Sequence, residues 1–193
     1  MKIVFATNNQ HKLKEIRHAI GNKFFILSLT DMKIFEEIPE RSDSIEGNAI
    51  QKAQYICHNY SVSCFADDTG LEVSALDNKP GIYSARYAGP ECCSRNNIKR
   101  VLAELAHIND RQARFRTVIA YSNRSYTKTF EGIVEGRIAY KPAGDEGFGY
   151  DPIFIPNGFN QTFAEMTLEQ KNAISHRSRA LKKFIEFLLS IDV

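Results

Sequence analysis

Two adjacent carboxylates form the most distinctive chemical feature of this sequence. Asp67 and Asp68 follow an apolar run and precede Thr69 and Gly70. Successive side chains of a strand point to opposite faces, so the two aspartates need not share a role. One of them, together with Glu40 upstream, could hold Mg²⁺, and a carboxylate can also activate water for attack on phosphorus. The alternative is an Asx turn that closes a strand.

Polar residues 7–12 follow an apolar run at residues 3–6. Backbone N–H groups at such a strand-to-helix turn attract anions, and Lys12 adds a positive charge. Thr7 and Asn8 add side-chain partners, although the segment lacks the glycines of a Walker loop. The alternative is an asparagine helix cap beside a surface lysine.

A second lysine, Lys52, is four residues from Asn48, so the two share one face of a predicted helix. Ala49 and Ala53 are small and would let this helix approach another element closely. The alternative is a solvated polar face beside an alanine-rich contact.

Two further segments carry groups that could recognise a nucleobase. In residues 147–152 an aromatic ring lies between two glycines, which permits close approach and stacking on a base. The alternative is a tight turn with a core aromatic residue. Lys171 and residues 175–177 gather donors near the start of the last helix, where the alternative is a capped helix with exposed basic residues.

The elements that must position these groups alternate between strands and helices, which is typical of an α/β protein. Apolar runs predict strands at residues 3–6, 24–27, 62–66, 70–76, 115–121 and 126–138, with a hairpin at 123–125 and a turn at 79–81. Helical periodicity predicts helices at 13–20 (ended by Gly21 and Asn22), 45–56, 96–105 and from 174 onward, the last with Leu181, Phe184, Ile185, Leu188 and Leu189 on one side.

Composition excludes several classes of protein. The 193 residues suit one domain or one domain with a small lobe, and the net charge of +2 favours neither nucleic acid nor a membrane surface as partner. The four cysteines show no zinc-ligand spacing and are expected to be reduced thiols. The apolar run at residues 3–6 is too short for a signal peptide, so a cytoplasmic location is expected.

In this order the segments resemble the inosine triphosphate pyrophosphatase family, the bacterial deaminated-purine enzymes in particular. The resemblance spans residues 3–189. The matching segments are 6–12, 47–53, 66–71, 80–89, 147–154 and 171–177, of which the fourth and fifth are the most specific. One departure is Glu46, which stands one position earlier than the acidic residue of the family and has no assigned role. Thr69 stands where serine is also common.

The resemblance implies an elongated α/β molecule with two lobes, a long central mixed β-sheet flanked by helices, and an active-site cleft between the lobes. Residues 1–193 would form one pyrophosphatase domain. It also implies a homodimer and hydrolysis of ITP, dITP, XTP and dXTP to the monophosphate and pyrophosphate, which cleanses the nucleotide pool.

The resemblance also implies roles for individual residues. The triphosphate would be bound by Thr7, Asn8, Asn9, Lys12 and Lys52; Glu40 and Asp68 would hold Mg²⁺; Asp68 would be the base for water; Thr69 would touch the substrate; Phe148 would stack on the base, near Gly149, Tyr150 and Asp151; and Lys171, His176 and Arg177 would contact the base.

Donors from His176 or Arg177 aimed at O6 would accept hypoxanthine and xanthine and reject adenine, whose N6 is itself a donor. This argument does not distinguish guanine. Three alternatives remain: a non-catalytic nucleotide sensor on the same scaffold, a related pyrophosphatase for modified pyrimidine or methylated guanine nucleotides, and a structural protein without turnover.

Overall fold

The computed structural model describes residues 2–21 and 24–191. The strands are β1 (Lys2–Phe5), β2 (Phe25–Ser28), β3 (Cys64–Val73), β4 (Lys79–Pro80), β5 (Gln112–Ser122), β6 (Thr127–Ile138) and β7 (Phe154–Pro156). The α-helices are α1 (Gln10–Ile20), α2 (Ile45–Tyr60), α3 (Ser94–Glu104), α4 (Leu168–Ile174) and α5 (His176–Ile191), and short 3₁₀ turns lie at Ser74–Leu76, Gly81–Arg86, Asp151–Ile153 and Phe163–Glu165. Within the described residues, none of the helices has both the length and the apolar character needed to cross a membrane.

The strands form one mixed sheet in the order β2-β1-β3-β5-β6-β7, with β4 paired to β3. Strand β1 is parallel to both β2 and β3, whereas β3 is antiparallel to β4 and β6 is antiparallel to β7. Phe5 lies opposite Phe65 in the register of β1 and β3. Continuing this register brings the residues after β1 to the level of the aspartates of β3. The prediction of an α/β fold with a mixed sheet flanked by helices is confirmed.

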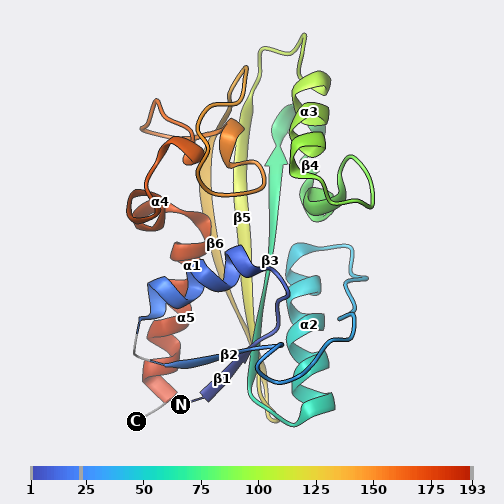
Figure 1. Cartoon of the computed structure of the whole chain (residues 1–193), viewed down its shortest axis with the longest axis vertical. Helices are drawn as coiled ribbons and strands as arrows, with labels where there is room; N and C mark the ends of the chain where they lie inside the picture. Colours follow the sequence, from blue (N-terminus) through green and yellow to red (C-terminus); the bar gives the residue numbers. More distant parts are fainter. Residues whose placement is uncertain (1, 22–23, 192–193) are drawn as a thin grey trace. The chain divides into compact units, whose positions relative to one another are not determined.

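Contacts divide the described chain into two compact units, each with its own core. The first unit comprises the residues up to Asp68, Thr117–Gly132 and the residues from Arg177; the second comprises Thr69–Arg116 and Ile133–His176. The core of the first unit packs α1 and α5 on β1 and β3, with the rings of Phe5 and Phe65 stacked 4.5 Å apart. Figure 1 shows α5 on one side of these strands and α2 on the other. The core of the second unit is built around Phe115, Phe154 and Phe163.

The structure corrects the prediction of two strands at residues 62–66 and 70–76. They are parts of one strand, β3, and Asp67 and Asp68 lie in its middle. The chain continues through them in extended conformation because β-branched Thr69 favours a strand and Gly70 adopts extended backbone. The alternative of an Asx turn at the two aspartates is therefore wrong.

Smaller differences also have local causes. The turn expected at residues 79–81 lies earlier, because Asp77 and Asn78 adopt left-handed conformations and Lys79 already pairs with β3. Lys171 lies on α4, separate from the last helix, which begins at His176.

The predictions for the first and last helices are confirmed in part. Gly21 ends α1 with φ 59° as expected, while Asn22 lies outside the described residues. Leu181, Phe184 and Leu188 are buried on α5, but Leu189 is half exposed because it lies one residue beyond the apolar stripe.

Candidate functional site

Lys52 stands at the centre of a cluster of oxygen atoms in the first unit. Its Nζ donates to Glu40 Oε1 at 2.6 Å, to the Asp67 carbonyl oxygen at 2.8 Å and to Asp68 Oδ1 at 3.1 Å. Lys52 and Asn48 are buried, so the alternative of a solvated polar face on α2 is wrong. Burial is possible because the charge of the lysine meets two carboxylates.

Helix α2 is placed against the sheet by small residues. Ala49 and Ala53 are fully buried, and they share the inner face of the helix with Lys52. Ser44 caps the helix by accepting a hydrogen bond of 3.0 Å from the N–H of Gly47. The helix can therefore lie close enough to β3 for the lysine to reach both aspartates.

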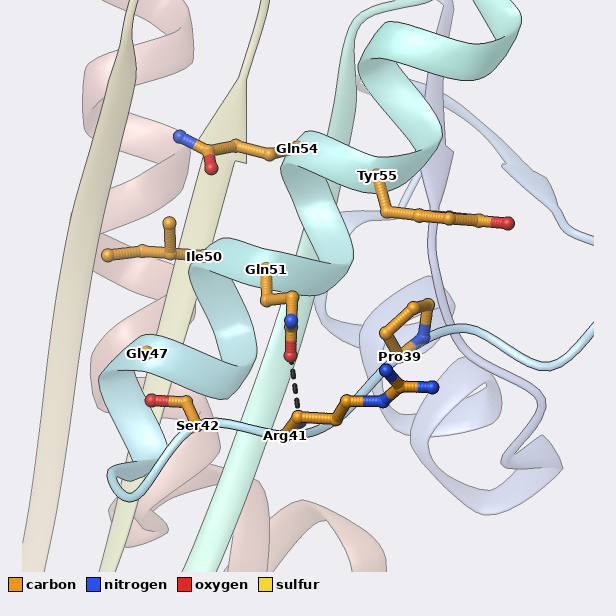
Figure 2. Close-up of a pocket in the computed structure, with 8 residues that line it drawn as sticks. All are labelled: Pro39, Arg41, Ser42, Gly47, Ile50, Gln51, Gln54 and Tyr55. Carbon is orange, nitrogen blue, oxygen red and sulfur yellow. Dashed lines mark hydrogen bonds between the residues drawn. The ribbon is translucent and has the colours of Figure 1, made fainter.

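The loop that carries Glu40 is tied to the same helix. The N–H of Arg41 donates to Gln51 Oε1 at 2.8 Å, as Figure 2 shows, and the N–H of Ser42 donates to Asn48 Oδ1 at 2.9 Å. A Cβ at Gly47 would lie 1.9 Å from Ser42 Oγ, so this approach requires glycine. The pocket drawn in Figure 2, about 470 Å³, is lined by Pro39, Arg41, Ser42, Gly47, Ile50, Gln51, Gln54 and Tyr55.

The structure also gives Glu46 a partner. Thr129 Oγ1 of β6 donates to Glu46 Oε1 at 2.9 Å on an exposed surface. Glu46 thus joins α2 to the sheet.

Asp67 connects two cations of the first unit, the half-buried Lys12 and the buried Arg177. Its Oδ1 lies 3.0 Å from Lys12 Nζ, and its Oδ2 accepts a hydrogen bond of 3.2 Å from Arg177 Nε. Arg177 also donates through its terminal nitrogen to the buried Glu15. Although burial alone would raise the pKa of Asp67, Lys12 and Arg177 hold that pKa well below its usual value. Asp67 is therefore charged and oriented by its partners.

The two aspartates consequently have different partners, as the alternation along a strand predicts. Burial raises the pKa of Asp68 above its usual value, although Lys52 opposes this shift. A raised pKa suits a carboxylate that accepts a proton from water. Desolvation also lowers the pKa of Lys12, although Asp67 opposes this shift. Lys12 is thus a half-buried partner of Asp67 rather than the surface lysine of the alternative interpretation.

The turn between β1 and α1 is partly a helix cap. Asn9 Oδ1 accepts hydrogen bonds from the N–H groups of His11 and Lys12, at 3.0 and 3.2 Å, and Thr7 Oγ1 accepts one from the N–H of Asn9 at 3.2 Å. The asparagine cap is thus confirmed, and it fixes the start of the helix that carries Lys12. Asn8 is exposed beside it.

The second unit holds Phe148 in a fixed loop. The N–H of Phe148 donates to Asp151 Oδ2 at 2.8 Å, and Lys171 Nζ lies 2.8 Å from the same oxygen. The ammonium also lies 4.9 Å from the centroid of the Phe148 ring, a cation–π contact. Gly147 has φ 75°, and a Cβ there would lie 2.1 Å from Asp151 Oδ2. The glycine therefore allows the carboxylate to reach the backbone of the aromatic residue.

Tyr150 and His176 belong to the core of the second unit. Tyr150 is buried, and its hydroxyl donates to the carbonyl oxygen of Ser84 at 2.8 Å. The His176 ring is stacked on Phe115 with centroids 4.5 Å apart. Thr69 is half buried in β3, directly after Asp68.

The predicted site residues therefore fall into two groups. The first unit contains Thr7, Asn8, Asn9, Lys12, Glu40, Lys52, Asp68 and Arg177; the second contains Thr69, Phe148, Gly149, Tyr150, Asp151, Lys171 and His176. Sequence reasoning missed Glu15, because its partner Arg177 lies far away in the sequence.

The chemistry of the first group fits a hard cation. Glu40, Asp68 and the Asp67 carbonyl oxygen all approach one ammonium group, so these oxygen atoms already surround a positive charge. No group of three or more His, Cys, Asp or Glu side chains that could hold a metal lies within the described residues. Mg²⁺ commonly binds through one or two carboxylates and completes its shell with water and phosphate oxygens. Glu40 and Asp68 meet that requirement.

The protein thus combines a mixed sheet with paired carboxylates, buried lysines and a glycine-flanked aromatic residue. Such groups suit the binding of a phosphate chain and a planar ring. The chain belongs to the Ham1 family, whose family model matches residues 3–187. This confirms the resemblance detected in the sequence.

The similarity to relatives extends over the whole chain. This chain is 48% identical to the dITP/XTP pyrophosphatase of Flavobacterium johnsoniae, over 97% of this chain and 98% of that protein. It is 49% identical to the dITP/XTP pyrophosphatase of Porphyromonas gingivalis, over 97% of both chains. Among solved structures, the Staphylococcus aureus Ham1 protein superposes with a TM-score of 0.90 at 38% identity, covering 98% of this chain and 99% of that one.

Proposed function

We propose that this chain hydrolyses deaminated purine nucleoside triphosphates, namely ITP, dITP, XTP and dXTP, to the monophosphate and pyrophosphate, and so cleanses the nucleotide pool. The observation that carries the proposal is the approach of Glu40 and Asp68 to one buried lysine beside a second lysine–aspartate pair. The names of the relatives support the same reaction.

Each group of the first unit has a role in this reaction. Lys12 and Lys52 bind the triphosphate together with Thr7, Asn8 and Asn9, because phosphoryl chemistry needs charge neutralisation more than covalent catalysis. Glu40 and Asp68 hold Mg²⁺, which supplies further positive charge at the phosphate oxygens. Asp68 orients a water molecule and accepts its proton while the water oxygen attacks the α-phosphorus and the bond to the β-phosphate oxygen breaks.

The residues of the second unit bind the base. Phe148 stacks on the purine, with Gly149 and Asp151 keeping the ring in place, and Lys171 and His176 add contacts. We assign the selection of O6 to Arg177 of the first unit, whose guanidinium group is held by ion pairs with Asp67 and Glu15. We also assign one functional domain over residues 1–193, a homodimer and a cytoplasmic location, on the strength of the family resemblance.

The test of this function is pyrophosphate release from ITP, XTP, GTP and ATP in the presence of Mg²⁺. We expect release from ITP and XTP to exceed release from ATP by roughly 100-fold or more, the range that unmatched buried donors produce. GTP carries the same O6 acceptor, so its rate measures any selection that O6 does not explain. Binding of ITP without any release would favour the non-catalytic sensor. Equal release from all four nucleotides would retain the chemistry and disprove the proposed base selection.

A second prediction concerns Phe148. Replacement by alanine removes the stacking surface, so the KM for ITP should rise by about tenfold, the effect of losing roughly 1–3 kcal/mol of base stacking. Steady-state kinetics with ITP measures this change. Phe159→Ala, which alters another partly exposed phenylalanine of the same unit, is the matched control. An unchanged KM in Phe148→Ala would remove Phe148 from the base site.

A further inference from the structure

Residues 80–89 form one of the two most specific segments of the sequence, yet the reaction described above assigns them no role. The structure shows a 3₁₀ turn at Gly81–Arg86 followed by a tight turn, with the N–H of Gly89 donating to the carbonyl oxygen of Arg86 at 3.1 Å. Tyr87 packs this segment into the core of the second unit. The backbone conformation of the segment is also held by hydrogen bonds from α3 and β3.

Asn97 on α3 makes most of these bonds. Its Nδ2 donates to the carbonyl oxygens of Ala85 at 2.8 Å and of Ser84 at 3.4 Å, and its Oδ1 accepts from the N–H of Ala88 at 2.7 Å. Asn97 is only 3% exposed, so these partners replace water for the whole side-chain amide. One side chain thus fixes three peptide groups of the segment.

Ser84 connects this segment by hydrogen bonds to the loop that contains Phe148. Its Oγ accepts from the N–H of Leu71 at 2.9 Å and donates to the carbonyl oxygen of Gly81 at 2.6 Å. Its carbonyl oxygen accepts the hydroxyl of Tyr150, which lies two residues after Phe148. The position of that carbonyl oxygen therefore determines where the buried Tyr150 is anchored.

Further contacts also support the loop between these anchors: the N–H of Asp151 donates to the carbonyl oxygen of Phe148 at 3.2 Å, and Lys171 Nζ lies 4.9 Å from the centroid of the Phe148 ring. Phe148 lies between Gly147 and Gly149, which have φ 75° and 63° and permit a wide range of backbone conformations. On one side the Phe148 N–H is bound by Asp151, and on the other the chain is bound through Tyr150. Loss of either anchor would let the glycines move the ring.

We propose that Asn97 is a positioning residue for the base-binding ring of Phe148, acting through Ser84 and Tyr150 without touching the substrate. In this arrangement Tyr150 also positions the ring rather than contacting the base, because its hydroxyl proton is committed to Ser84. The inference rests on the proposed function of Phe148. It gives the segment at residues 80–89 a role in nucleotide affinity.

The experiment compares Asn97→Ala, Tyr150→Phe and the double variant with the unaltered chain. The control is Asn96→Ala, which removes the exposed neighbour of Asn97 on the same helix. For each protein, KM and kcat are measured with ITP, and inhibition is measured with inorganic triphosphate, which has no base. Circular dichroism melting establishes that each variant is folded.

Asn97→Ala should raise the KM for ITP by about fivefold to tenfold, and Tyr150→Phe by about threefold, the effect of one lost hydrogen bond. In both variants kcat should stay within about twofold and inhibition by inorganic triphosphate should be unchanged, because only binding of the base is weakened. The double variant should resemble Asn97→Ala, since the two residues act in one chain of contacts.

Three results would overturn the inference. One is an unchanged KM for ITP in folded Tyr150→Phe. This variant also tests the inference if Asn97→Ala does not fold. Another is a parallel loss of kcat and of triphosphate inhibition, which indicates general damage. The third is full additivity in the double variant. Failure of the proposed function looks different: the unaltered chain would release no pyrophosphate, or Phe148→Ala would leave the KM unchanged.

Discussion

Asp68→Asn should lower kcat for pyrophosphate release from ITP by at least about 10²–10³-fold. The amide keeps the shape of the side chain but has neither the charge that binds Mg²⁺ nor the basicity that removes a proton from water, and a general base alone contributes about 10²–10⁴-fold. The fold should persist, because Lys52 keeps its bonds to Glu40 and to the Asp67 carbonyl oxygen. Burial already raises the pKa of Asp68, so loss of its charge removes an unfavourable interaction.

Single-turnover release of pyrophosphate measures this loss directly, and a thermal melt with and without ITP measures binding. Asp43→Asn is a matched control, because Asp43 is an exposed aspartate of the same unit. If Asp68→Asn retained most of the rate, the base would have to be another group, and the assignment of the cation to Glu40 and Asp68 would be wrong.

The types and order of the elements were predictable because their signals are local. Apolar runs and helical periodicity located the strands and helices to within a few residues, as at β1 and α2. The short elements β7 and α4 were not predicted. The boundary error with the clearest cause was at β3, where two aspartates and a glycine appeared to end a strand. Pairing along β3 and the two cations that contact the buried Asp67 outweigh the local preference for a turn.

The chemistry of the site was also predictable, but its burial was not. Solvated or surface positions were the alternative interpretations for Lys12 and Lys52, because lysine is seldom buried without a partner. The partners come from distant segments: Lys52 pairs with Glu40 and with β3. Ion pairs between distant segments leave no periodic signal, and for the same reason Glu15 was missed.

Arg177→Ala should destabilise the folded chain by about 3–5 kcal/mol, the cost of leaving buried carboxylates without their cation. Arg177 is 3% exposed and joins Asp67 to Glu15. Its removal leaves Glu15 without that partner and Asp67 with Lys12. Arg177→Lys should recover only part of the loss, because one ammonium group cannot reproduce the two separate donors of the guanidinium.

Urea denaturation followed by circular dichroism measures this change in the free energy of unfolding. Arg179→Ala, at an exposed position two residues further along α5, should change it by less than about 0.5 kcal/mol. If Arg177→Ala lowered the free energy of unfolding by as little as Arg179→Ala, the buried ion pairs of Arg177 would contribute little to stability. Such a result would also imply that Asp67 and Glu15 are protonated or hydrated in the folded chain.

The same pair of variants tests base selection. If Arg177 selects O6, the preference for ITP over ATP should fall by about tenfold or more in Arg177→Lys, measured as the ratio of kcat/KM values under conditions where the variant is folded. An unchanged ratio with a lower rate on both nucleotides would mean that Arg177 only orients Asp67 and, through it, Lys12. Selection would then depend on Lys171 and His176, whose side chains lie with Phe148 and Phe115 in the second unit.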